Sequence, residues 1–208
     1  MFSSKGNQYL LFILTSLLIY SCSESTGPDS SNFDLVSFAI GNQWKYKMTT
    51  YDSTGSVINQ QSGTRTIDVD TIINGVTWYR YAYDFPGVWN TNKSDGYWQF
   101  LEADTLWFRN DTSWIEYKFP TRVGDVYGNP EYSKEVVSVS DRVSVPAGIF
   151  NTIHITQDAT RNNNSLQVSI ERYICPGIGF VKSMQIGKRY DGTKYVVWKS
   201  ELESYSIK

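Results

Sequence analysis

Turn-forming residues separate short strand-like segments along this chain, and this spacing limits the folds that the chain can adopt. Gly, Asn, Asp, Ser and Thr recur roughly every ten residues, between segments rich in Tyr, Trp, Val and Ile that favour extended strands. After residue 22, no segment keeps an apolar period of 3.6 residues over three turns. The pattern therefore predicts an all-β protein.

The predicted strands follow one another through short connections, as in an antiparallel meander. Asn74-Gly75 is the strongest hairpin signal, and longer connections are expected at 86–96 and 120–133. A meander of about ten or eleven strands can form a curved sheet, a half-barrel, a barrel or a sandwich. The expected strands are 43–52, 62–73, 76–85, 97–102, 105–109, 112–119, 134–145, 149–158, 166–174, 180–188 and 194–207.

One short motif occurs twice and suggests two repeated halves. Ile40-Gly41-Asn42-Gln43-Trp44 is similar to Val123-Gly124-Asp125-Val126-Tyr127, and a Phe precedes each of them. A glycine also opens the return strand in each half, after Asn74-Gly75 and after Ala147-Gly148. The halves would span 34–118 and 119–208. The alternative is that two strands of one β protein share the same turn chemistry.

The N-terminus has the features of a bacterial lipoprotein signal. A polar start with Lys5 precedes an apolar run over 9–20, which is shorter than the roughly 20 residues that a spanning helix needs. Ile19-Tyr20-Ser21-Cys22 resembles the lipobox, although Tyr20 is bulkier than usual. The resemblance implies cleavage after residue 21 and acylation of Cys22, which would anchor the chain in a membrane. Ser23 and Glu24 resemble the start of surface-lipoprotein tethers, and Ser23 is not the aspartate that retains lipoproteins at the inner membrane, so the outer membrane is expected. The polar segment 22–32 then reads as a tether, and 33–208 as a single β domain.

Composition argues against several classes of function. The formal net charge of −2 does not favour binding to nucleic acid, which calls for a basic surface. With Cys22 used for lipid, Cys175 stands alone, so neither a disulfide framework nor a cysteine metal site is expected. Cys175 is predicted to be a buried, inert thiol. The single histidine, His154, is expected on the polar face of a strand.

No residue is predicted to be catalytic, to ligate a metal or to hold a cofactor. The chain lacks the Gly-x-Ser-x-Gly motif of serine hydrolases, and Lys93 is unsuited to a calcium loop at 90–96. Asp68 and Asp70 share one face of a strand, but no second pair of carboxylates is placed across a cleft from them. A protein that is not an enzyme is therefore expected.

Four motifs together resemble a group of envelope lipoproteins of Bacteroidota and related phyla. They are Ile40-Gly41-Asn42-Gln43-Trp44-Lys45-Tyr46, Val145-Pro146-Ala147-Gly148-Ile149-Phe150, Pro176-Gly177-Ile178-Gly179-Phe180-Val181-Lys182 and Glu201-Leu202-Glu203-Ser204-Tyr205. The resemblance implies a mostly antiparallel β domain, such as the half-barrels of LolA- and LolB-like lipoprotein carriers. It implies no activity.

An aromatic stretch supplies the candidate ligand-binding residues: Tyr79, Tyr81, Tyr83, Trp89 and Trp98. The three tyrosines alternate onto one face of a predicted strand, and Trp89 lies in the loop that follows. Tyr and Trp combine an apolar body with a polar tip, which suits both a lipid-lined cavity and stacking on sugar rings. Three hypotheses remain open: a lipoprotein that binds an apolar or amphipathic ligand in a cupped sheet, a surface module for glycan binding or adhesion, and a structural envelope protein without a small-molecule ligand.

Overall fold

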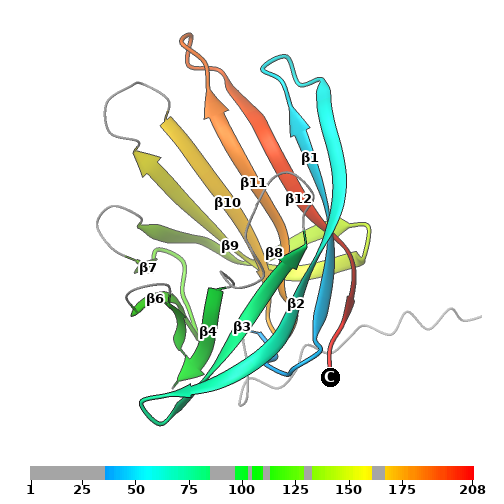
Figure 1. Cartoon of the computed structure of the whole chain (residues 1–208). Helices are drawn as coiled ribbons and strands as arrows, with labels where there is room; N and C mark the ends of the chain where they lie inside the picture. Colours follow the sequence, from blue (N-terminus) through cyan, green and yellow to red (C-terminus); the bar gives the residue numbers. More distant parts are fainter. Residues whose placement is uncertain (1–35, 85–96, 103–104, 110–112, 129–132, 161–166) are drawn as a thin grey trace, which may run out of the picture.

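The described part of the chain forms one antiparallel β-sheet of twelve strands (Figure 1). The computed structural model describes residues 36–84, 97–102, 105–109, 113–128, 133–160 and 167–208. Its strands are β1 (Gln43–Tyr51), β2 (Val57–Ile73), β3 (Val76–Asp84), β4 (Tyr97–Glu102), β5 (Thr105–Arg109), β6 (Ser113–Lys118), β7 (Val126–Tyr127), β8 (Lys134–Val145), β9 (Gly148–Thr160), β10 (Gln167–Cys175), β11 (Gly179–Lys188) and β12 (Lys194–Ser206). The predicted all-β meander is confirmed.

Each strand pairs with its neighbours in the chain except at the step from β6 to β7, and β1 also pairs with β12. The order across the sheet therefore runs from β6 to β1 and then from β12 to β7, which leaves β6 and β7 as the edge strands. The sheet curves so strongly that β2 and β3 cross in front of β8 and β9 in the view of Figure 1. The result is a curved sheet that stays open between β6 and β7.

Two strands differ from the prediction. β2 begins at Val57 rather than residue 62, because its polar first residues pair with β1 although their sequence has no apolar alternation. The turn before it is held by Asp52, whose Oδ1 accepts from the amides of Thr54 (2.8 Å) and Ser56 (3.0 Å). The two-residue strand β7 lies inside the predicted connection 120–133, where so short a strand leaves no periodic signal.

The β2–β3 hairpin has the turn that the sequence indicates. Asn74 and Gly75 both have positive φ, at 54° and 80°, and the register joins Ile73 to Val76. A two-residue turn with positive φ at both positions matches the right-handed twist of the flanking strands, and Asn-Gly adopts it with little strain.

The repeated motif forms the same backbone structure twice. The amide of Gly41 donates to the carbonyl of Ile67 at 2.8 Å. The amide of Gly124 donates to the carbonyl of Val136, also at 2.8 Å. Ile67 and Val136 each donate back to the residue after the glycine at 2.9 Å, and the glycines have φ of 90° and 88°. A side chain at either glycine would therefore be strained.

The strand order extends this correspondence to the whole sheet. β1–β6 and β7–β12 are two six-stranded meanders that follow one another in the same direction across the sheet. Trp44 of β1 lies opposite Arg65 of β2, and Tyr127 of β7 lies opposite Lys134 of β8. These equivalent registers support the expected division into two repeated halves.

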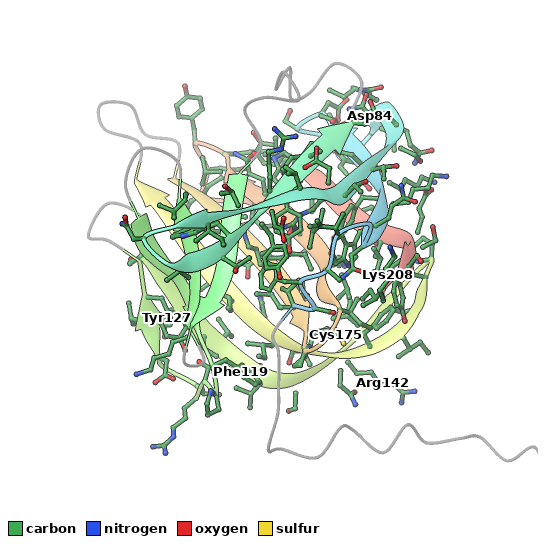
Figure 2. All side chains as sticks on the ribbon, turned by 60° about the horizontal axis from the view of Figure 1, so that its bottom comes forward. Asp84, Phe119, Tyr127, Arg142, Cys175 and Lys208 are labelled. Carbon is green, nitrogen blue, oxygen red and sulfur yellow. The ribbon has the colours of Figure 1, made fainter. Side chains whose placement is uncertain are left out.

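The core joins residues from both halves, and their side chains point into the space that the strands surround (Figure 2). The segment before β1 closes one end of this space, since Val36 forms an isolated bridge with Ile178. The indole of Trp44 donates to the carbonyl of Ile178 at 2.7 Å, and the amide of Ala147 donates to Leu202 at 2.9 Å. None of the described residues belongs to a helix that is long and apolar enough to cross a bilayer.

Candidate functional site

The concave side of the sheet is identified by alternating burial along β1. Trp44, Tyr46 and Met48 are buried. Gln43, which precedes Trp44, and Lys45, which lies between Trp44 and Tyr46, are exposed. Residues that lie opposite one another on neighbouring strands share a face, so the register extends this inner face across the sheet.

The three candidate tyrosines share one face of β3, as predicted, and the register shows that this is the inner face of the sheet. Tyr81 is fully buried, while Tyr79 and Tyr83 are half-buried against the core. The ring of Phe38 stacks on Tyr79, with centroids 5.3 Å apart, and also contacts Tyr81. Trp89 lies outside the described residues. The backbone of Trp98 lies in β4, opposite Arg80, and its side chain is outside the described part. The role of these five residues in binding a ligand stays a prediction.

Arg65 lies at the centre of this aromatic region, on β2. Its guanidinium carbon is 3.4 Å from the ring centroid of Tyr81 and 5.6 Å from that of Tyr83. The rings of Trp44 and Phe180 are 5.8 and 5.5 Å away. The guanidinium remains charged in proteins, and the aromatic faces stabilise that charge where water is excluded.

The hydroxyl groups of Tyr46 and Tyr81 beside Arg65 are neutral at physiological pH, because burial raises the pKa of each. Burial raises the pKa of Tyr46 to about 12, and its hydroxyl donates to the carbonyl of Phe180 at 2.9 Å. Burial also raises the pKa of Tyr81 above its ordinary value, although the charge of Arg65 opposes this shift. The hydroxyl of Tyr81 is buried and makes no hydrogen bond.

A row of contacts leads from Arg65 across the inside to the second half of the sheet. Phe180 of β11 packs edge-on against Tyr117 of β6, with ring centroids 5.9 Å apart. The ammonium of Lys134 on β8 lies 4.8 Å from the centroid of Tyr117. Lys134 is buried and occupies in its half the position that Arg65 occupies in the other.

Farther along β10–β12 the inner face becomes polar and partly exposed. The indole of Trp198 donates to the side-chain oxygen of Gln185, which lies opposite it on β11. The guanidinium of Arg172 donates to Gln157 on the neighbouring strand. Ser183 and Ser200 face each other between these pairs. An inner face that only stabilised the sheet would be more apolar.

Sequence analysis missed the two buried cations. Arg65 lies two residues before the buried Ile67, and Lys134 lies two residues before the buried Val136. Because strand residues two apart share a face, alternation alone places each cation on the buried face. The repeated motif was a second signal. Ile67 and Val136 bond to the repeated glycines Gly41 and Gly124, and each buried cation lies two residues before one of these strand residues.

His154 lies on the outer face, between two carboxylates on neighbouring strands. Its Nδ1 is 3.1 Å from Asp141 Oδ2 on β8, and its Nε2 is 2.6 Å from Glu171 Oε2 on β10. The ring also stacks on Tyr173, with centroids 4.4 Å apart. The hydrogen bond to Glu171 raises the pKa of His154, and the same bond lowers the pKa of Glu171. The expected polar-face histidine is thus part of an ion-pair cluster.

This cluster predicts that stability falls as the medium becomes alkaline. Because the pKa of His154 is raised in the folded state, its ion pairs contribute fully to stability below pH 6.5, its ordinary pKa. This contribution to stability is lost as pH rises through the folded-state pKa. The lowered pKa of Glu171 contributes fully to stability above pH 4.5, its ordinary pKa, and this contribution is lost only in more acidic solution. Urea midpoints of the wild type should fall from pH 6 to pH 9, while those of His154→Gln should change less. Parallel curves for the two proteins would contradict this account.

Cys175 was predicted to be buried, but it ends β10 and is only half-buried. The reason is its place at the end of the strand, next to the turn at Pro176. Burial nevertheless raises the pKa of Cys175 from 9.0 to about 11. The thiolate, which is the reactive form, is therefore about 100-fold scarcer than for an ordinary thiol at neutral pH.

We expect iodoacetamide to label Cys175 in the native protein at least tenfold more slowly than in the urea-unfolded protein. Equal labelling rates would refute the prediction that this thiol is inert.

The His154 cluster is not arranged as a metal centre. Within the described ranges, no group of three or more His, Cys, Asp and Glu side chains has a geometry that could hold a metal ion. Both ring nitrogens of His154 already face carboxylate oxygens. The arrangement is that of a structural ion-pair cluster joining β8, β9 and β10.

Comparisons with known proteins identify the fold. No protein-family model matches the chain, and no curated protein matches it. A protein of Bacteroides fragilis described as exported and as having a YMCC-like fold aligns with a TM-score of 0.55 and 13% identity, over 82% of this chain and 98% of that one. A protein of Parabacteroides distasonis described as a lipoprotein aligns with a TM-score of 0.55 and 12% identity, over 84% of this chain and 99% of that one. The described sheet therefore has the same overall fold as these two proteins.

Proposed function

We propose that this chain is a lipid-anchored lipoprotein of the outer membrane, and that it binds an amphipathic small molecule on the inner face of its sheet. The observation that carries the proposal is the mixed character of that face. Tyr83, Trp198, Gln185 and Arg172 are only partly buried there, and polar pairs stand beside aromatic rings. Ligand sites combine apolar walls with a few placed polar groups in this way.

Two further findings support a place in the cell envelope. The segment ending at Cys22 resembles a lipobox, and the two proteins with the same fold are described as an exported protein and a lipoprotein. Neither finding concerns the ligand, so the ligand needs a direct test.

The test is native mass spectrometry of the soluble chain that starts at Ser23, produced in its own host. The sheet and its core lie within residues 36–208, so this chain contains the whole described fold. A small molecule that co-purifies would establish a binding protein, and its mass would distinguish a lipid from a glycan. An apo mass that persists after incubation with envelope lipids and glycans would contradict ligand binding and favour a structural role.

A further inference from the structure

Charges are distributed unequally between the two faces of the sheet. Among the described side chains, three cations lie on the inner face: Arg65, Lys134 and Arg172. The described carboxylates that form ion pairs lie on the outer face: Asp68 with Arg80, Asp141 and Glu171 with His154, Glu201 with Lys199, and Glu203 with Lys45. The register also places one exposed carboxylate there, because Asp70 of β2 lies opposite Tyr79 of β3, so the described inner face carries both signs of charge with cations in excess, although the chain as a whole has a net charge of −2.

Two buried donors on the inner face have no acceptor among the described residues, and one of them, the hydroxyl of Tyr81, belongs to the site around Arg65. The hydroxyl of Tyr81 and the side-chain nitrogen of Gln61 are buried, and neither makes a hydrogen bond. Buried polar groups are nearly always paired, because an unmade hydrogen bond costs free energy. Tyr81 is fully buried, and its ring lies directly under the guanidinium of Arg65.

The groups around Arg65 suit an acidic head group. Tyr46, Tyr81 and Tyr83 are close enough to Arg65 to interact electrostatically with it. A carboxylate or phosphate accepts hydrogen bonds from guanidinium and hydroxyl donors, and such charge-assisted bonds are stronger than neutral ones. The rings of Trp44 and Phe180 provide apolar surface beside these donors.

We infer that the bound molecule is an anionic amphipath whose acidic head group pairs with Arg65 and accepts a hydrogen bond from Tyr81. Its apolar part lies along the aromatic inner face. This inference rests on the proposed function and adds the chemical class of the ligand. The required feature of the ligand is an acidic head group, and either a carboxylate or a phosphate would provide it.

Calorimetry with ligands of one chain length tests the head group. The soluble chain from Ser23 is titrated, below the micelle concentration, with dodecanoate, dodecyl phosphate, dodecanamide and dodecyltrimethylammonium. The anions should bind at least about tenfold more tightly than the amide, which has the same chain without the charge. The stronger of the two anions then distinguishes a carboxylate ligand from a phosphate ligand.

Tyr81→Phe tests the site itself, because it removes the hydroxyl and keeps the ring over Arg65. Since that hydroxyl makes no hydrogen bond in the protein, the variant should fold normally and bind the anions about tenfold more weakly. Tyr190→Phe is the matched control, because Tyr190 is fully exposed, and it should bind as the wild type does.

The outcomes separate this inference from the proposed function. Equal affinity for dodecanoate and dodecanamide, or a higher affinity for dodecyltrimethylammonium, would overturn the inference that the ligand is an anion. The proposal that the protein binds an amphipathic ligand would then still hold. Unchanged anion binding in a folded Tyr81→Phe would overturn the site. Failure of all four amphipaths to bind would overturn both proposals.

Discussion

Replacing Trp44 by alanine is expected to lower the free energy of unfolding by about 4 kcal/mol, within the range for large aromatic residues in cores. The indole is only 2% exposed and packs edge-on against Tyr81, with centroids 5.7 Å apart. It also donates to the carbonyl of Ile178, across the inside of the sheet. The variant therefore loses packing in the core and leaves the partly buried carbonyl of Ile178 without its donor.

Urea denaturation measures this effect, and two variants provide the comparison. Trp44→Phe keeps a ring but cannot donate to Ile178, so it should lose about half as much stability. Tyr190→Ala removes a ring of similar size from a fully exposed position and should change stability by less than about 0.5 kcal/mol. A loss below about 1 kcal/mol for Trp44→Ala would show that Trp44 is not central to the core.

Replacing Cys22 by serine is expected to abolish acylation and, with it, partition into the detergent phase. Each buried CH₂ of an acyl chain contributes about 0.8 kcal/mol, so two or more chains anchor a protein stably. Detergent phase separation of the full chain, with the mass of the N-terminal peptide, measures both effects. Cys175→Ser is the matched control, because it removes the other cysteine and should leave partition unchanged. An unmodified Cys22 in the wild type would refute the lipobox assignment.

Local sequence patterns predicted much of the sheet. Asn74-Gly75 indicated its hairpin because the turn depends on two neighbouring residues with positive φ. The alternation of Tyr79, Tyr81 and Tyr83 indicated a shared face because strand geometry repeats every two residues. The paired motifs at Gly41 and Gly124 indicated equivalent structures, and their hydrogen bonds are equivalent.

Features that depend on distant residues were not predicted. Lys134 and Arg65 were not recognised as buried cations, because their aromatic surroundings come from strands that are far apart in sequence. Phe180, which contacts Arg65, lies on β11, and Tyr117, which contacts Lys134, lies on β6. Likewise, the alternation around His154 predicted a polar face, but not the carboxylates of Asp141 and Glu171 on either side of it.

The amino-acid sequence by itself determined the β class and the main turns, and it indicated the two similar halves, while the signal ending at Cys22 stays a prediction. Each of these depends on residues that are close along the chain, so elementary backbone geometry relates pattern to structure. Only the tertiary structure decided that β1 pairs with β12, that the sheet stays open between β6 and β7, and that Arg65 lies among four rings. These features arise when strand curvature brings distant segments together, and many different pairings are compatible with the same local pattern.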